Sequence, residues 1–435
     1  MRGCRAVRGR RSVRSIRWRD WAAVAVTAIL LMILAACSGG SSGGSSSTGV
    51  TPTPPPPVNV SNVQPVYMDY GPIVNSQNVG FNNTLYTTVV ICVPGTTACQ
   101  SIDHVIVDTG STGLRIPASL VTLSLPYVTD SSNNPIGNCV QYADTSYQWG
   151  PIVKVDVQLA GEVASSVPIQ IVGPANFAAV PSLCTSGGTP AQTVAALGAN
   201  GILGIGLFRQ DCGSACAAAA PPAVYFTCPA SGCVAASVPL ATQLQNPVWM
   251  FPQDNNGVAI VLPQVGAVGS VSLAGSIIFG IGTQSDNALG GAQAQGADSG
   301  GNFTTTFNGK AYSGSFIDSG SSGYFFLDSS TTGLPNCAAN SDANGFYCPG
   351  SPAAFTAINS GPNPRGTGVP VSINVAFGIA NALPLIDSPA AVFNNIGGPS
   401  SGLFDWGIPF FLGRTVFVGI EGQSSAAGTG PYWAY

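Results

Sequence analysis

Two short stretches decide the fold of this chain: VIVDTGSTGLRIP at residues 105–117 and GSFIDSGSSGYFFL at residues 314–327. In each stretch an apolar run ends on an aspartate, which is followed by Thr or Ser, then Gly, then Ser. The two aspartates are Asp108 and Asp318, 210 positions apart. The apolar run predicts a buried strand and the tetrad a tight turn, so each stretch is expected to present one carboxylate at a strand end.

A second element recurs after each tetrad at nearly the same interval. The glycine of Leu203-Gly204 lies 96 residues after Asp108, and the glycine of Leu412-Gly413 lies 95 residues after Asp318. The chain is therefore expected to contain two versions of one unit.

The composition favours an all-β chain. With 435 residues and 45% hydrophobic content, the chain can bury a core large enough for two or three domain-sized units. Its 55 Gly and 34 Pro, together with many Val, Thr and Ser, indicate short strands joined by turns.

Local patterns place several elements. Residues 153–159 alternate between apolar and polar side chains, which predicts a half-buried strand that turns at Gly161-Glu162 into a second strand at 167–172. Asn308-Gly309 is a hairpin signal between 303–307 and the strand that carries Asp318. The short helix candidates are Leu240 to Leu244 and Ala353 to Ile358, whereas Pro221-Pro222 argues against a helix over 216–223.

The N-terminus has the pattern of an export signal. Eight arginines precede residue 20, an apolar segment covers 21–36, and Leu34-Ala35-Ala36-Cys37 resembles the lipobox of bacterial lipoproteins. The resemblance implies a signal peptide at 1–36 and a lipid on Cys37. The alternatives are an ordinary signal peptide or an uncleaved N-terminal anchor.

Residues 37–64 are rich in Gly, Ser and Pro and are expected to form a tether rather than a folded unit. The expected location is the bacterial cell envelope, where the lipid would hold the protein to a membrane. A Ser after Cys37 implies, by the same resemblance, the outer membrane in a cell that has two. After Cys37 there are 17 acidic residues against 6 basic ones, which argues against a nucleic-acid partner.

Ten cysteines follow Cys37, an even number that suggests disulfides in an oxidising compartment. Short loops favour the pairs Cys92 with Cys99 and Cys337 with Cys348. The pairing within 212–233 stays open, and a zinc site formed by its four cysteines is the alternative there. These four residues are Cys212, Cys216, Cys228 and Cys233.

Five segments together resemble the ordered landmarks of pepsin-like, two-lobed aspartic peptidases. They are VIVDTGSTGLRIP, NGILGIGLF, GSIIFGIGTQSDNAL, GSFIDSGSSGYFFL and FFLGRTVFVGIEG, spread over most of residues 65–435. The resemblance implies two β-barrel-like lobes, at 65–284 and 285–435, with a central cleft between them. It also implies that Asp108 and Asp318 form a catalytic pair, each supported from beneath by its Leu-Gly element.

The resemblance and the chemistry of the tetrads assign roles to the residues around the pair. Gly110 and Gly320 let backbone amides approach the inner carboxylate oxygens, and Ser111 and Ser321 can donate hydroxyls to the outer ones. By resemblance, the two loops are locked together by Thr109 and Ser319.

Two carboxyls in contact cannot both ionise, so they share a proton, as in aspartic proteases generally. The ionised member can take a proton from a bound water while its partner donates to the peptide carbonyl. The implied activity is that of an endopeptidase acting as a monomer on polypeptides, with no metal or cofactor.

The chain departs from the family pattern in places. Arg115 stands where the family usually has Trp and is expected to alter the contact with the flap, the hairpin that covers the cleft. The flap tyrosine is assigned to Tyr142, with Tyr147 and Trp149 as competing candidates, and residues 38–64 contain no basic pro-segment.

The single histidine, His104, is expected to pack or hydrogen-bond on the strand of Asp108. One His and two Glu make a Ser-His-Asp triad or a His-based zinc site improbable. Asp298-Ser299-Gly300 and Asp387-Ser388-Pro389 resemble the tetrads but lack their context.

Two hypotheses follow. The first is an envelope-anchored aspartic endopeptidase that uses Asp108 and Asp318. The second is a non-catalytic lipoprotein of the same fold that binds a peptide, glycan or envelope partner in its cleft.

Overall fold

The computed structural model describes residues 62–185, 187–221 and 223–435. Strands make up 43% of the structure and helices 9%, which confirms the all-β expectation. The predicted signal peptide, Cys37 and nearly all of the tether lie outside the described residues. Within the described part of the chain, no helix has the length and apolar character needed to span a bilayer.

The first half of the chain forms a closed six-stranded barrel in the order β4-β5-β11-β6-β9-β8, and pairing of β8 with β4 closes it. A hairpin, β7–β8, extends from this barrel and pairs onward with β12 and β13. The elements of this body are β2 (Ile73–Val74), β3 (Gln77–Asn78), β4 (Tyr86–Cys92), β5 (Cys99–Asp108), β6 (Thr112–Pro117), β7 (Ile136–Gln141), β8 (Ser146–Leu159), β9 (Glu162–Val172), α1 (Ser182–Thr185), β10 (Thr189–Pro190), α2 (Val194–Leu197), β11 (Gly201–Ile205), α3 (Ser214–Ala218), β12 (Tyr225–Thr227) and β13 (Val234–Ala235).

The second half forms a half-barrel of seven strands in the order β21-β20-β17-β18-β23-β19-β22. Its elements are β17 (Phe303–Phe307), β18 (Lys310–Ile317), β19 (Tyr324–Leu327), α4 (Ser329–Thr332), β20 (Ala353–Gly361), β21 (Val371–Ile379), α5 (Ala382–Ile386), β22 (Gly397–Gly398), β23 (Ser400–Trp406) and α6 (Ile408–Phe411).

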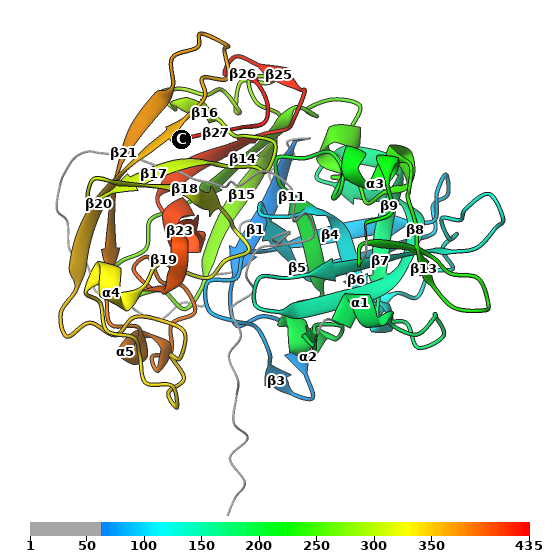
Figure 1. The fold of residues 1–435 in the computed structure, drawn as a ribbon, viewed down its shortest axis with the longest axis horizontal. Coiled ribbons are helices and arrows are strands. Elements are labelled where there is room, and N and C mark those ends of the chain that lie inside the picture. Colours follow the sequence, from blue (N-terminus) through cyan, green and yellow to red (C-terminus); the bar gives the residue numbers. More distant parts are fainter. Residues whose placement is uncertain (1–61, 186, 222) are drawn as a thin grey trace, which may run out of the picture.

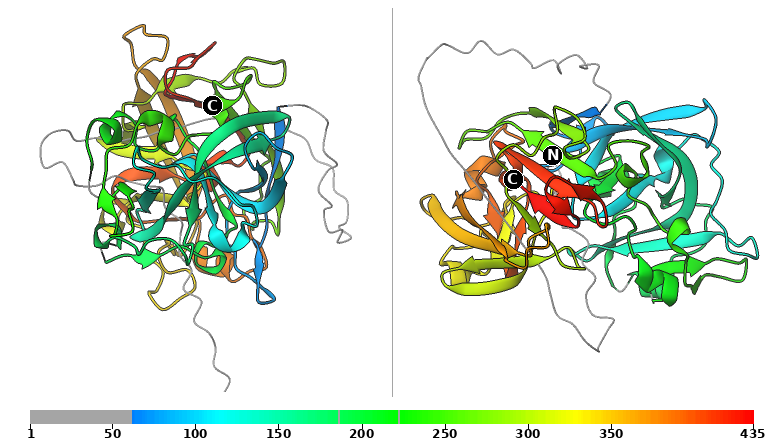
Figure 2. Two further views of the ribbon diagram at one scale, coloured as in Figure 1. Left: turned by 90° about the vertical axis from the view of Figure 1, so that its right-hand side faces the viewer. Right: turned by 90° about the horizontal axis from the view of Figure 1, so that it is seen from above.

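Strands from both ends of the chain run between the two bodies. They continue the first sheet in the order β1-β15-β14-β24-β27-β16, so the N-terminal strand of the described chain lies beside strands that follow it by some two hundred residues. Figure 1 shows the barrel and the half-barrel on either side of these strands, and the second view in Figure 2 shows the same separation from above. The strands are β1 (Val63–Met68), β14 (Gly257–Leu262), β15 (Leu273–Phe279), β16 (Ala294–Gly296), β24 (Arg414–Gly419) and β27 (Tyr432–Ala434).

The local predictions have mixed outcomes. The hairpin at Asn308-Gly309 is confirmed, because Phe307 pairs with Lys310, and residues 153–159 are confirmed as part of β8. Within 153–159 the apolar side chains are buried and Lys154 and Gln158 are partly exposed, as expected of a half-buried strand, whereas residues 146–153 of the same strand are buried throughout. The Ala353 to Ile358 helix is wrong, since this segment belongs to β20 and pairs with β21.

Two further helix predictions need correction. Leu240 to Leu244 is reduced to a 3₁₀ turn at Leu240–Thr242. Conversely, α3 occupies the start of the alanine-rich segment and ends at Ala218, before Pro221 can disturb it.

Five disulfides close loops in both bodies. Cys92–Cys99 and Cys337–Cys348 are confirmed, and the cysteines of 212–233 pair as Cys212–Cys216 and Cys228–Cys233. Cys139–Cys184 ties the β7–β8 hairpin to α1. Because all four cysteines of 212–233 are in disulfides, the zinc alternative for them is wrong.

His104 bridges two carboxylates in the middle of β5, the strand that carries Asp108, which confirms that it is hydrogen-bonded. Its Nδ1 lies 2.7 Å from Asp103 Oδ2 and its Nε2 lies 3.3 Å from Asp69 Oδ2. Hydrogen bonds to these two carboxylates raise the pKa of His104 despite the opposing effect of burial, which is the largest single cause.

This raised pKa predicts a pH-dependent contribution to stability. The folded state binds the proton more tightly than the unfolded one, so the contribution is full below about pH 6.5 and is lost as the pH rises through the raised pKa. We expect His104→Gln to cost on the order of 1 kcal/mol or less at about pH 5, because Asp69 and Asp103 are partly exposed and screened by solvent. Thermal melts of both proteins should converge at about pH 9, and a gap that does not change with pH would contradict this assignment.

Candidate active site

Asp108 lies at the end of β5, in the middle of the barrel wall. The three apolar residues before it are fully buried. Strand β11 runs parallel to β5, with Leu203 opposite Val107 and Gly204 opposite Asp108. The predicted support of Asp108 by Leu203-Gly204 is therefore confirmed.

Asp318 occupies the matching place at the end of β18 in the half-barrel. Strand β23 runs parallel to β18, with Asp405 opposite Phe316 and Trp406 opposite Ile317. The Asp318 N–H donates to the Trp406 carbonyl at 3.1 Å. Continuing this register places Gly407 opposite Asp318, as Gly204 is opposite Asp108.

The predicted support of Asp318 by Leu412-Gly413 is wrong. A short helix, α6, follows Gly407 and carries the chain away from Asp318 before Leu412 is reached. The Gly413 N–H instead donates to the Leu262 carbonyl at 3.0 Å, where β24 begins its pairing with β14. Several apolar-Gly pairs follow the second tetrad, and the interval from Asp318 favours Leu412-Gly413 over Trp406-Gly407 because it matches that of the first tetrad.

The two aspartate loops hold each other through reciprocal hydrogen bonds. The Thr109 N–H donates to Ser319 Oγ at 3.1 Å, and the Ser319 N–H donates to Thr109 Oγ1 at 2.9 Å. Each hydroxyl also reaches the strand of the other body, Ser319 Oγ at 2.7 Å from the Val107 carbonyl and Thr109 Oγ1 at 3.4 Å from the Ile317 carbonyl. The predicted lock between the loops is present, and it joins the barrel to the half-barrel at the site.

Each carboxyl group also has the predicted local partners. The Gly110 and Gly320 N–H groups donate to the inner oxygens, Oδ1 of Asp108 and Oδ1 of Asp318, both at 2.8 Å. Ser111 Oγ donates to the outer oxygen of Asp108.

On the other loop, Ser321 Oγ lies 2.9 Å from Asp318 Oδ2. These contacts fix the orientation of both side chains.

The inner oxygens, Oδ1 of Asp108 and Oδ1 of Asp318, both lie next to Gly320. A Cβ added to Gly320 would lie 2.8 Å from Asp108 Oδ1 and 3.1 Å from Asp318 Oδ1, so glycine is needed for both carboxyls to approach this point. Asp108 and Asp318 are hydrogen-bonded to each other and are 2% and 0% exposed. Burial raises the pKa of Asp318 well above its usual range, and the nearby charges of Asp108 and Asp405 raise it further.

The β7–β8 hairpin contributes Tyr142, which is buried on the side of the barrel that carries Asp108. It packs in a cluster with Ile106 of β5, the strand that carries Asp108, and Ile202 of the neighbouring β11. Its hydroxyl donates to Gln148 Oε1 at 2.8 Å, and burial raises its pKa, with a smaller increase from the charge of Asp108.

Tyr147 and Trp149 belong to a different cluster, around the Cys139–Cys184 disulfide. Of the three flap candidates, Tyr142 is therefore the one whose environment includes Asp108.

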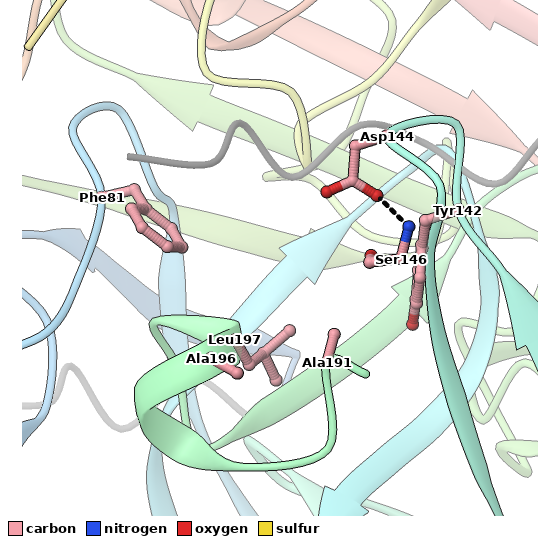
Figure 3. Close-up of a pocket in the computed structure, with 7 residues that line it drawn as sticks. All are labelled: Phe81, Tyr142, Asp144, Ser146, Ala191, Ala196 and Leu197. Carbon is pink, nitrogen blue, oxygen red and sulfur yellow. Dashed lines mark hydrogen bonds between the residues drawn. The ribbon is translucent and has the colours of Figure 1, made fainter. Parts of the chain in front are cut away.

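Figure 3 shows the small pocket beside Tyr142. Tyr142, Asp144 and Ser146 come from the hairpin and face Phe81 and the α2 region across it. The remaining walls are formed by the apolar side chains Ala191, Ala196 and Leu197.

Arg115, the departure from the family pattern, lies 1% exposed inside the barrel body. Its Nη1 donates to the Thr112 carbonyl at 2.9 Å and its Nη2 lies 3.4 Å from Asp211 Oδ2. Burial raises the pKa of Asp211 to about 6, against the opposing effect of the Arg115 charge. The charge of Arg115 also opposes the burial-driven rise in the pKa of Tyr142, so it acts on the hairpin electrostatically.

Sequence reasoning missed two acids near the site residues: Asp211, whose side chain is 10% exposed, and the buried Asp405. Asp405 lies in β23, is 4% exposed, and places its Oδ2 2.7 Å from Ser321 Oγ. A signal for it exists, because an acid between Phe404 and Trp406 is unusual in an apolar strand. Asp298, from the tetrad-like sequence Asp298-Ser299-Gly300, lies in a separate turn, where it accepts from the Gly300 N–H at 2.7 Å.

Within the described residues, no group of three or more His, Cys, Asp or Glu side chains is arranged to hold a metal ion. A family profile described as "Protein of unknown function (DUF3443)" matches residues 58–435. No curated protein matches the chain.

Proposed function

The chain belongs to the DUF3443 family of proteins of unknown function, and we propose that it is an aspartic endopeptidase. The observation that carries the proposal is the contact between Asp108 and Asp318, two buried carboxyls from opposite bodies with matching partners. The reciprocal hydrogen bonds between the two aspartate loops support a pepsin-like arrangement of two lobes. The strand pattern around each aspartate, which is similar in the barrel and the half-barrel, supports it as well. The hairpin with Tyr142 would serve as the flap over the cleft.

The protonation states follow from the surroundings of each acid. Asp318 has the raised pKa and an additional acid, Asp405, beside it, so it keeps the shared proton while Asp108 remains a carboxylate. A water bound between them gives a proton to Asp108 and attacks the peptide carbonyl carbon. Asp318 donates its proton to the carbonyl oxygen, which forms a neutral tetrahedral gem-diol.

Breakdown of this intermediate completes the reaction. Asp108 returns its proton to the leaving nitrogen, one hydroxyl proton of the gem-diol passes back to Asp318, and the C–N bond breaks. The products are a carboxylic acid and an amine, and the pair is restored with one proton. No covalent link to the enzyme forms, so a nucleophilic Ser or Cys is not required.

The proposed cellular setting follows from the N-terminal sequence. A lipid on Cys37 would hold the folded body to a membrane of the bacterial envelope, and the tether up to residue 64 would give it reach. The substrates would be exported polypeptides with extended, accessible segments. The disulfides are consistent with an oxidising compartment.

The test is cleavage of an unfolded protein by the full-length protein in detergent, from about pH 3 to pH 7. We expect cleavage with an optimum on the acidic side, because a rise in pH removes the shared proton and a large fall in pH adds a second proton to the pair. A statine-type peptide should inhibit, whereas a metal chelator and a serine-directed reagent should not. No cleavage at any pH, combined with peptide binding in the cleft, would favour a non-catalytic binding protein instead.

A further inference from the structure

The hydroxyl of Ser321 contacts two carboxyl groups. Its Oγ lies 2.9 Å from Asp318 Oδ2 and 2.7 Å from Asp405 Oδ2. A hydroxyl has one hydrogen to donate, and an ionised carboxylate can only accept. Both contacts can therefore be hydrogen bonds only if one of the two carboxyls carries a proton.

Counting hydrogens along the whole row decides which carboxyl this is. The row Asp108, Asp318, Ser321, Asp405 contains three contacts, and Ser321 supplies one of the three hydrogens that they need. The other two must be carboxyl protons. If Asp405 were ionised, Asp108 and Asp318 would both be protonated and no base would remain to accept a proton from water.

We propose that Asp405 is a positioning residue that works as a neutral carboxylic acid, donating to Ser321 so that the Ser321 hydroxyl donates to Asp318. The proposal rests on the proposed function, because it assumes a pair that works with one shared proton. It adds that the active state holds two protons on three carboxyls.

The surroundings of Asp405 favour its neutral form. The side chain is 4% exposed, on β23 between β18 and β19, where its register partners are Phe316 and Phe325. Through Ser321 it faces Asp318, and Asp108 lies beyond. Tyr324 on β19 lies opposite Trp406, and its hydroxyl interacts with Arg414. A buried acid beside other acids and aromatic rings is more stable protonated.

The barrel body has no carboxyl group at the position that corresponds to Asp405. At the position of Asp405 relative to its aspartate, β11 has Ile202, opposite Ile106. Ser111 is consequently free of a second carboxyl there, and its hydroxyl can serve Asp108 alone. The asymmetry gives the two otherwise similar aspartates different surroundings and assigns the additional proton to the Asp318 side.

The main test is Asp405→Asn in the full-length protein. An asparagine amide donates to Ser321 as the neutral acid does but does not ionise. We expect kcat within about threefold of wild type at the acidic optimum. On the alkaline side, log(kcat/KM) should fall with a slope of one in the variant and approach two in wild type, which has two protons to lose.

The opposite assignment gives a different result. If Asp405 were ionised in the active state, Asp405→Asn would remove a negative charge beside Asp318, the alkaline limb would move to lower pH, and kcat would fall at every pH. A shift of the alkaline limb to lower pH, or a fall in kcat at every pH, would overturn the proposal. Asp387→Asn, an exposed acid of the same body, is the matched control and should leave the profile unchanged.

Two further measurements test the proposal if a variant misfolds or if the protein has no cleavage activity. The effects of Asp405→Ala and Ser321→Ala on kcat should be non-additive, because both substitutions act on one hydroxyl, and additive effects would contradict the proposal. An infrared difference spectrum, wild type minus Asp405→Asn at neutral pH, should show the C=O stretch of a protonated carboxyl. If this band is absent, Asp405 is not neutral, and this result holds even if the protein cleaves no substrate. If the band is present but no cleavage is seen, only the proposed peptidase function is refuted.

Discussion

Asp108→Asn and Asp318→Asn are each expected to lower kcat/KM for peptide cleavage by roughly 10³-fold or more. Asparagine keeps the size of the side chain and can still accept from the Gly110 or Gly320 N–H. It cannot take a proton from water at position 108 or give one to the carbonyl at position 318. The double variant should be no slower than either single one, because the two carboxyls act as a unit.

Stability separates this loss from unfolding. The native state of wild type holds two buried acids in contact, so replacing one of them by a neutral amide should leave the thermal midpoint unchanged or raise it. Asp298→Asn is the matched control: its carboxylate accepts from a glycine N–H two residues on, as in the tetrads, but away from the pair. Cleavage that persists in Asp108→Asn or Asp318→Asn would remove the peptidase assignment.

The parts of the site that were predictable are those set by local chemistry. A tetrad of Asp, Ser or Thr, Gly and Ser after an apolar strand fixes its own turn, because the glycine N–H and the serine hydroxyl both reach the carboxyl oxygens from within the tetrad. The repetition of this tetrad predicted two such turns, and the resemblance to two-lobed aspartic peptidases implied that they meet. The contact between Thr109 and Ser319 followed from the resemblance and is present.

The errors arise where several segments satisfy the same local rule. Gly407 and Gly413 both follow apolar residues, and only the pairing of β23 with β18 distinguishes them. Residues 353–358 lack strong strand formers at several positions, yet β20 forms because β21 and β17 supply its partners. Asp405 could not be placed because its contact with Ser321 depends on this same long-range pairing.

Gly407→Ala is expected to be the most destabilising of the small substitutions near the site. The register places Gly407 opposite Asp318, and an added Cβ would lie 2.3 Å from the Gly323 carbonyl oxygen and 2.4 Å from the Ser321 carbonyl oxygen. Both contacts are with backbone, which cannot swing aside as a flexible side chain can. We expect a loss of about 3 kcal/mol or more in the free energy of unfolding, together with loss of cleavage, since the loop of Asp318 must shift.

Gly413→Ala tests the same geometry from the other side. Gly413 has a φ of +80°, so alanine costs roughly 1–2 kcal/mol in backbone strain, but its nearest contact is the Gln264 side chain at 3.2 Å. This variant should remain folded and keep its cleavage activity, because α6 separates Gly413 from the Asp318 loop. Chemical denaturation of both variants ranks them directly. Greater damage from Gly413→Ala than from Gly407→Ala would restore Leu412-Gly413 as the support of Asp318 and would place β23 in a different register.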